Sequence, residues 1–411
     1  MQTANLSALS IEDIVPELSS QIEVHETDAK NFIVHQTEYN WRLKINQRTN
    51  RLLRIVDGKK SISEITSLFN NSFDAKVQES EVYALLYKGS LASNGIVKSS
   101  IKLRTADTIS YLKFRIPLLQ AKNLHKLSHL IGFLYNPRTF YLSSFTIIAV
   151  LIPIFFHYLS LQTIYRVLTG PYLLYITLFS LFTTLLHEFG HVSACRKFGA
   201  VHGPIGAGFY LFMPVFYADV SDAWRLKSSE RIIVDFAGIY VELLIATILT
   251  LLFLVFNNLI FLTTAFFIFI QTFRNMNPFL RFDAYWAVTD YFNISNLRKE
   301  SNLIFNLTIY SIFKRTDSPL KSKKDYFLFV YSFLSWAIIC IWLCLTLLLD
   351  MNSVIYLPFN LYSTFKTIFM SFDTITFGWL KMHFLMLLIP VSFYLIAGNI
   401  LIKQFQTKSK L

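Results

Sequence analysis

The stretch FTTLLHEFGHVSACRKFGA, residues 182–200, places titratable side chains at the end of an apolar run. His187, Glu188 and His191 form the pattern H-E-x-x-H. On a helix, positions i and i+4 share one face, so both imidazoles can reach a single ion, and imidazole nitrogen suits Zn²⁺. Glu188 is then placed to take a proton from a zinc-polarised water and to pass it to a leaving amine. The pattern predicts zinc-dependent peptide hydrolysis, and a hydrogen-bonded polar cluster at a helix end is the non-catalytic alternative.

Two histidines leave a zinc site incomplete, so a third ligand must come from another segment. The run NMNPFLRFDAYW offers Asp283. Asp219 is a rival, because a carboxylate can bind zinc wherever the geometry allows. Glu242, inside a later apolar run, is better explained by a hydrogen bond to a ligand or to another helix. Asn277 and Pro278 could open the helix and expose backbone that pairs with a substrate, and helix capping by Asn277 is the alternative.

Together the two motifs resemble the site-2 intramembrane zinc metalloprotease family, with H-E-x-x-H on one span and N-P-x-x-x-x-D at the end of a later one. The resemblance implies one catalytic residue, Glu188, and three zinc ligands, which by position are His187, His191 and Asp283. The family often has a second proline before the aspartate and a glycine after it, whereas this sequence has Leu280 and Ala284 there. These departures put the local backbone geometry in question but keep the ligating carboxylate.

Composition places this site in a membrane. The chain has 411 residues, of which 54% are hydrophobic and 16% are charged, and its mean hydropathy is +0.45. Several apolar runs reach the length of about 20 residues that crosses a bilayer. They cover residues 140–159, 172–191, 232–256, 259–276, 326–349 and 383–402. The run 361–380 is interrupted by Lys366 and Asp373, so we expect it to lie at the interface or to re-enter the membrane.

Positive charges orient the spans, because loops rich in Lys and Arg stay in the cytoplasm. The segments 192–231 and 281–325 and the C-terminal tail are rich in these residues, whereas the links 163–170 and 351–360 hold a single one, Arg166. We therefore expect a multi-pass protein of the cell membrane with both termini in the cytoplasm. The same topology brings the ends of the second and fourth spans to one depth, as coordination of one ion by both would require.

The chain divides into a cytoplasmic domain at residues 1–130 and a membrane domain at residues 131–411. The start, MQTANLSALSIEDIVPELSS, has neither the basic region nor the apolar core of a signal peptide, so the first domain should stay in the cytoplasm. The expected fold class is an α-helical polytopic membrane protein, with about six transmembrane helices, preceded by a small α+β winged-helix-like domain.

Local patterns predict the order of elements in the first domain. NFIVHQTEYNWRLKIN, residues 31–46, reads as two strands because it is rich in β-branched and aromatic residues. Two helices should follow, with Ser61 and Glu64 forming a capping box at the start of the second. A third helical segment over 79–93 should end at a glycine signal, before a strand that begins at Ile96.

The stretches LKINQRTNRLLRIVDGKKSISEI and LASNGIV resemble the PqqD-like domain, which binds leader peptides of ribosomally made, modified peptides. Its physical principle is pairing of an extended peptide with an exposed strand edge. The segment 208–231 resembles the region after the first motif in site-2 proteases that carry such a domain, and we expect it to form a re-entrant loop or hairpin beside the site. A generic winged-helix module with a structural role is the alternative.

Both resemblances imply a zinc protease that cuts a ribosomally made precursor, for example a modified, bacteriocin-like peptide, at the cytoplasmic side of the membrane. The implied partners are a peptide or protein substrate, the lipid bilayer, and a peptide-modifying enzyme or exporter. Two alternatives stay open: a regulatory protease that cuts transmembrane anchors of signalling proteins, and a non-catalytic component of peptide export or immunity. The net charge of +12 suits cytoplasmic loops and does not indicate nucleic acid, since no reading module is present.

Overall fold

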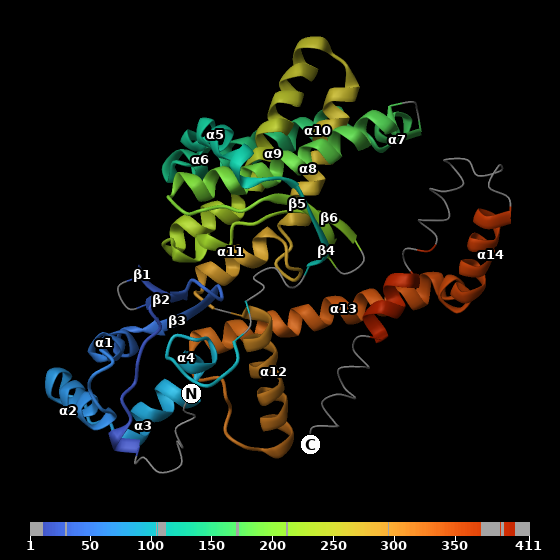
Figure 1. Ribbon diagram of the computed structural model, residues 1–411. Coiled ribbons are helices and arrows are strands. Elements are labelled where there is room, and N and C mark those ends of the chain that lie inside the picture. Colours follow the sequence, from blue (N-terminus) through green and yellow to red (C-terminus); the bar gives the residue numbers. More distant parts are fainter. Residues whose placement is uncertain are drawn as a thin grey trace. The chain divides into compact units, whose positions relative to one another are not determined.

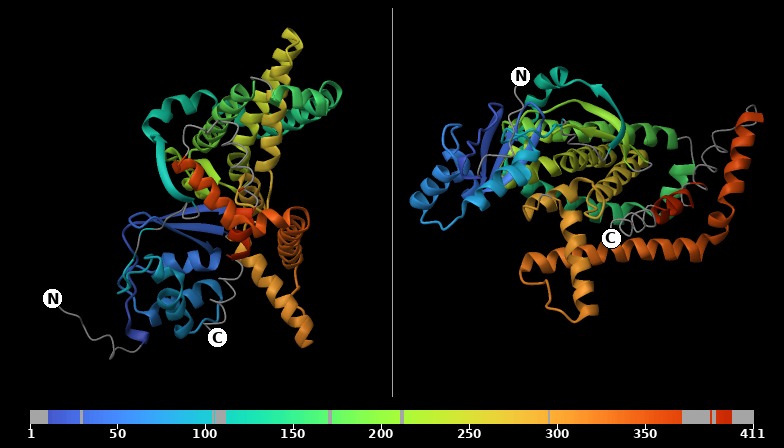
Figure 2. Two further views of the ribbon diagram at one scale, coloured as in Figure 1. Left: turned by 90° about the vertical axis from the view of Figure 1, so that its right-hand side faces the viewer. Right: turned by 60° about the horizontal axis from the view of Figure 1, so that its bottom comes forward.

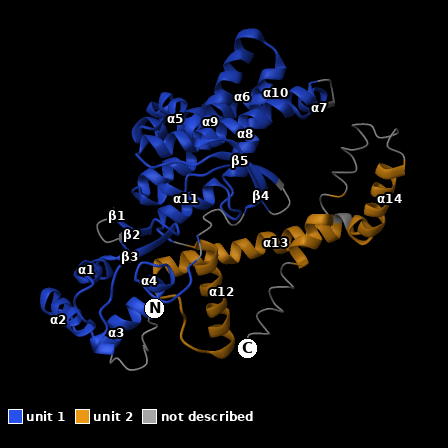
Figure 3. Cartoon of the chain, in the orientation of Figure 1, with its two compact units in different colours: residues 1–295 blue, residues 296–411 orange. Residues whose placement is uncertain are grey.

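The computed structural model describes residues 11–28, 31–103, 105, 112–169, 172–210, 213–294, 296–370, 387 and 390–398. The chain divides into two compact units, unit 1 at residues 1–295 and unit 2 at residues 296–411 (Figure 3). Unit 1 contains a small N-terminal module, a second sheet and the helices that carry both chemical motifs. The regular elements described in unit 2 are helices.

The N-terminal module is built on an antiparallel sheet in the order β1-β2-β3 (Figure 1). Its strands are β1 (Ile22–Asp28), β2 (Asn31–Gln36) and β3 (Trp41–Asn46). The two strands predicted over 31–46 are confirmed as β2 and β3, whose register pairs Asn31 with Asn46 and Gln36 with Trp41. β1 is an addition that the sequence pattern does not indicate, because its charged residues in IEVHETD obscure the alternation typical of strands.

Short helices complete the module and share a hydrophobic core with the sheet. They are η1 (Ile11–Asp13), α1 (Gln47–Ile55), α2 (Ile62–Phe73), α3 (Glu79–Tyr83), the π-helical turn η2 (Ala84–Lys88) and α4 (Ser90–Ser93). The capping box of Ser61 and Glu64 is confirmed at the start of α2. The strand predicted from Ile96 is wrong: only a single bridge joins Val97 to Leu18, because the two segments exchange only the hydrogen bonds that flank this pair.

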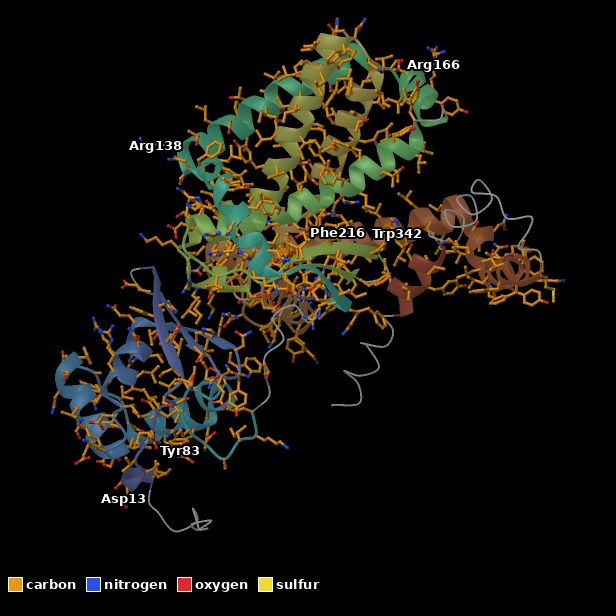
Figure 4. All side chains as sticks on the ribbon, turned by 45° about the horizontal axis from the view of Figure 1, so that its top comes forward. Asp13, Tyr83, Arg138, Arg166, Phe216 and Trp342 are labelled. Atoms are coloured by element: carbon orange, nitrogen blue, oxygen red, sulfur yellow. The ribbon has the colours of Figure 1, made fainter. Side chains whose placement is uncertain are left out.

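Longer helices make up most of the remainder of unit 1 (Figure 1). They are α5 (Ala121–Leu130), η3 (Gly132–Tyr135), α6 (Pro137–Tyr158), α7 (Leu161–Thr169), α8 (Leu173–Lys197), η4 (Ser221–Arg225), α9 (Ser228–Phe256), α10 (Leu259–Asn275) and α11 (Asp283–Tyr291). α9 is central, because it packs against α6, α8, α10 and α11. Arg138 in α6 and Arg166 in α7 lie at opposite ends of this helical region (Figure 4).

A second antiparallel sheet, in the order β4-β5-β6, accompanies these helices (Figure 2). Its strands are β4 (Leu112–Leu119), β5 (Ile205–Tyr210) and β6 (Met213–Ala218). The hairpin expected in the segment 208–231 is thus present as β5 and β6, and β6 packs against α8. β4 pairs with β5, and α5 packs against α8. The domain boundary at residue 130 stays a prediction, and residues just before it contribute to the surroundings of α8.

Unit 2 contains α12 (Leu297–Lys314), α13 (Lys323–Ile355) and α14 (Leu357–Met370). α12 and α13 pack against each other, and the rings of Phe305 and Phe329 stack between them with centroids 5.7 Å apart. A capping box of Ser322 and Asp325 starts α13.

Four described helices are long and apolar enough to cross a membrane: α6, α8, α9 and the part Lys323–Leu348 of α13. These helices indicate a membrane protein. α10 is also apolar but shorter, with 17 residues. Half of the predicted span 383–402 lies outside the described residues, so the count of six stays a prediction. Residues 361–370 of the interrupted run belong to α14, and the rest of that run lies outside the described residues.

Candidate metal centre

His187 and His191 stand one turn apart near the C-terminal end of α8, as their spacing predicts. Their Nε2 atoms are 3.1 Å apart. Both residues are buried, with exposed fractions of 3% and 7%. The helix therefore presents two imidazole nitrogens to one point inside the protein.

Asp283, the first residue of α11, meets the two histidines. Its Oδ2 lies 3.0 Å from His187 Nε2 and its Oδ1 lies 3.5 Å from His191 Nε2. Tetrahedral ligands at the 2.0–2.1 Å typical of zinc would stand about 3.3 Å from one another. The three side chains predicted as ligands are therefore brought together at separations that suit donor atoms around one ion.

Backbone and side-chain acceptors orient both imidazole rings. His191 Nδ1 lies 2.7 Å from the carbonyl oxygen of Val234, which can only accept, so Nδ1 carries the proton. His187 Nδ1 lies 3.2 Å from Oε1 of Glu242. The bond at Nδ1 leaves the Nε2 lone pair of His191 toward Asp283, and a carboxylate beside Nδ1 favours the same tautomer for His187.

Glycines allow the close approach of α8 and α9 at this point. A Cβ on Gly238 would lie 2.4 Å from His187 Nε2, and one on Gly190 would lie 2.7 Å from the Ala237 carbonyl oxygen. Neither distance is compatible with a side chain in the present packing. The ring of His187 thus occupies space that exists only because position 238 has no side chain.

Glu188 lies beside the cluster and is also buried, with 9% of its surface exposed. Its carboxylate accepts a hydrogen bond from the backbone N–H of Ala218 at the end of β6. It lines the same cavity as His187, His191 and Asp283. The residue predicted as the catalytic base is therefore next to the donor atoms without being one of them.

The chain is similar to a protein of Bacillus subtilis (strain 168) named "Putative peptide zinc metalloprotease protein YydH". The two are 29% identical over an alignment of 188 residues that covers 43% of this chain and 72% of that protein. No protein-family model matches the chain. No solved structure matches it either. The name of this relative agrees with the chemistry of two histidines, a carboxylate and an adjacent glutamate.

The turn before Asp283 is held by β5 and by its own side chains. The backbone N–H of Arg281 donates to the Tyr210 hydroxyl at 3.1 Å, and the Tyr210 and Phe282 rings meet edge to face. Asn277 Oδ1 accepts from the Phe279 N–H at 2.9 Å, so its side chain caps the turn. Asn277 is not a cavity-lining residue, nor is Pro278. Substrate binding by these two residues stays a prediction.

A cavity of about 550 Å³ opens beside the cluster. Its wall runs along α8 from Thr177 to His191 and includes β6 from Pro214 to Ala218. The far wall is polar and aromatic and comes from η4, α9, α10 and α11; it includes Trp224, Arg231, Asp235, Asn275, Trp286 and Asp290. The cavity thus combines a mainly apolar lining with a group of polar and charged side chains.

An ion pair in this wall has no signature in the sequence. Arg231 Nε donates to Asp290 Oδ1 at 2.8 Å, and a second guanidinium nitrogen donates to the Leu226 carbonyl oxygen at 2.9 Å. Burial raises the pKa of the Asp290 carboxyl, although the Arg231 charge acts in the opposite direction. The two residues are separated widely along the chain, so residue spacing could not reveal the pair.

The rival third ligand, Asp219, is engaged elsewhere. Its Oδ1 accepts hydrogen bonds from the backbone N–H and the hydroxyl of Ser221. Among the described residues, Asp219 does not belong to the group of donor atoms formed by His187, His191 and Asp283. Glu242 contacts His187 on the side of the ring away from Asp283, as expected of a residue that hydrogen bonds a ligand. The geometry therefore favours Asp283 over both alternatives as the third ligand.

Proposed function

We propose that this protein is an intramembrane zinc metalloprotease of the site-2 type that hydrolyses a peptide bond near the cytoplasmic face of the membrane. One observation carries the proposal: two histidine Nε2 atoms and the Asp283 carboxylate converge within 3.0 to 3.5 Å, with Glu188 alongside. The similarity to a protein named as a peptide zinc metalloprotease supports the same reaction.

In this mechanism His187, His191 and Asp283 would hold Zn²⁺, which would polarise a carbonyl and lower the pKa of water. Glu188 takes the proton from the attacking water and then delivers it to the amine that leaves. The Val234 carbonyl keeps His191 in the tautomer that presents Nε2.

The shape of the cavity supports an extended substrate. Its wall follows α8 from Thr177 to His191, a rise of about 21 Å. About six residues of extended chain would span this length. β6 lies at the edge of its sheet and lines the cavity, so its backbone is placed to pair with such a chain.

We further propose that the substrate is a ribosomally made precursor, modified or bacteriocin-like, and that the N-terminal module recognises its leader in the cytoplasm. The β1-β2-β3 sheet supports this proposal, because an antiparallel sheet of three strands offers edges for peptide pairing. A modifying enzyme or an exporter would then act before or after the cleavage.

The test uses the full chain in lipid nanodiscs with Zn²⁺ and a library of quenched fluorescent peptides. Wild-type protein should cleave some members, whereas Glu188→Gln should bind zinc with unchanged stoichiometry and lose at least about 100-fold in rate, the usual scale for a general base. Glu12→Gln, at an exposed position of η1, is the matched control and should cleave normally. Cleavage by Glu188→Gln at the wild-type rate would refute the assignment.

A second set of probes separates the substrate classes. If the protein cuts soluble extended peptides and ignores a reconstituted single-span helix, the precursor-peptide proposal holds. Preferential cleavage of the helix would instead favour a protease of transmembrane anchors. Peptide binding with no cleavage by zinc-loaded wild-type protein would favour a non-catalytic export or immunity component.

A further inference from the structure

Glu242 is a carboxylate in the middle of a membrane-type helix, α9, and its side chain is fully buried. An ionisable group in such a position is expensive and is kept only where it serves a purpose. The proposed reaction makes no direct use of this group, because Glu188 handles the proton and Asp283 supplies the third ligand.

Among the described residues, hydrogen-bond donors and one imidazole nitrogen surround the Glu242 carboxylate. Gln271 Nε2 donates to Oε1 at 2.8 Å and the Thr272 hydroxyl donates to Oε2 at 3.0 Å. Asn275 Nδ2 lies 3.5 Å from each oxygen. His187 Nδ1 approaches Oε1 to 3.2 Å. The carboxylate therefore accepts hydrogen bonds from three side chains on α10 and lies 3.2 Å from one ring nitrogen on α8.

These donors connect the carboxylate to two parts of the metal centre. A carboxylate that only accepts holds the proton of His187 on Nδ1, which leaves the lone pair of Nε2 facing Asp283. Asn275 is the last residue of α10, and the turn that follows leads directly to Asp283. Gln271 also donates to Thr184 on α8 at 2.9 Å, which links the two helices again.

We propose that Glu242 is the positioning residue of the metal centre: it sets the tautomer and ring orientation of His187 and fixes the end of α10 that carries the chain to Asp283. This inference rests on the proposed function, since it assumes that the cluster binds zinc. The competing explanation is that Glu242 only joins helices by hydrogen bonds.

The experiment measures zinc affinity and the visible spectrum of the cobalt(II)-loaded full chain in detergent, with no peptide present. Glu242→Gln keeps the shape but must turn an N–H₂ group toward at least one donor. Zinc affinity should fall about 10- to 100-fold, the range found when a residue that hydrogen bonds a ligand is changed. The cobalt spectrum should shift, because the His187 ring turns.

Thr272→Val keeps the volume of the side chain and removes one donor to Glu242, so it serves if Glu242→Gln does not fold. It should weaken zinc binding several-fold. Thr250→Val is the matched control, because among the described residues that buried hydroxyl donates within α9, to the Ala246 carbonyl oxygen. It should leave affinity and spectrum unchanged.

Wild-type zinc affinity and an unshifted cobalt spectrum in both Glu242→Gln and Thr272→Val would overturn the inference, even if thermal stability fell, since that pattern describes a packing role. The proposed function is judged separately by peptide cleavage. A wild-type protein that binds zinc but cleaves no probe would remove the protease assignment while leaving the role of Glu242 in place.

Discussion

Gly238→Ala gives the sharpest test of the metal centre, because one methyl group would occupy the space of one ligand. The new Cβ would lie 2.4 Å from Nε2, 2.5 Å from Cδ2 and 2.6 Å from Cε1 of His187. An ordinary contact needs at least 3.4 Å, so the imidazole must move by about 1 Å. Zinc ligands tolerate displacements of about 0.2 Å.

We expect zinc affinity to fall at least about 100-fold. This is the upper end of the effect seen when a residue that contacts a metal ligand is changed. Stability should change much less. Overpacking costs about 1–3 kcal/mol, but alanine favours the helix over glycine by about 1 kcal/mol. Competition with a fluorescent zinc chelator gives the affinity, and thermal unfolding in detergent gives the stability.

Gly132→Ala is the matched control, because its Cβ would meet Lys197 at 3.7 Å, an ordinary contact. This variant should bind zinc like the wild type. If Gly238→Ala also binds zinc with unchanged affinity, then His187 is not held against α9 as described. The assignment of His187 as a ligand in this geometry would then be refuted.

Other changes test the remaining parts of the structure. Asp283→Ala should abolish stoichiometric zinc binding, whereas Asp219→Ala should preserve it; the reverse result in a metal assay would exchange their roles. Asp290→Ala removes the carboxylate that accepts from the buried Arg231 and should lower the free energy of unfolding by up to about 3–5 kcal/mol, a loss that an unchanged thermal midpoint in detergent would contradict. Ser61→Ala removes the capping box of α2 and should cost about 1 kcal/mol, measured as a lower unfolding midpoint of the N-terminal module.

Local periodicity was sufficient to place His187, Glu188 and His191. Their relation depends only on the pitch of one helix, and α8 has that pitch. Asp283 needed more, because it belongs to another segment. The prediction that it meets the histidines came from a resemblance and from the expected depth of two spans, and the structure brings the three side chains together.

The features that sequence reasoning missed depend on pairing between distant segments. β4 contains alternating apolar residues, but the helices α5 to α8 separate it in the sequence from its partner β5. No local pattern can therefore join the two strands. The Arg231–Asp290 pair depends on how α9 and α11 are rotated toward each other. Helix rotation is set by packing, which residue spacing within a single helix does not determine.

One face of α9 explains why the histidines of α8 are placed as they are. Val234, Gly238 and Glu242 recur every fourth residue, so they lie along one stripe of the helix. The Val234 carbonyl orients His191, the missing side chain of Gly238 makes room for the His187 ring, and Glu242 orients that ring from its other nitrogen. The stripe on α9 thus contacts and orients both histidines of the H-E-x-x-H motif. Because both imidazoles are oriented by this single stripe, a rotation of α9 about its axis would disturb them together. We therefore expect substitutions along it to be strongly non-additive in zinc affinity.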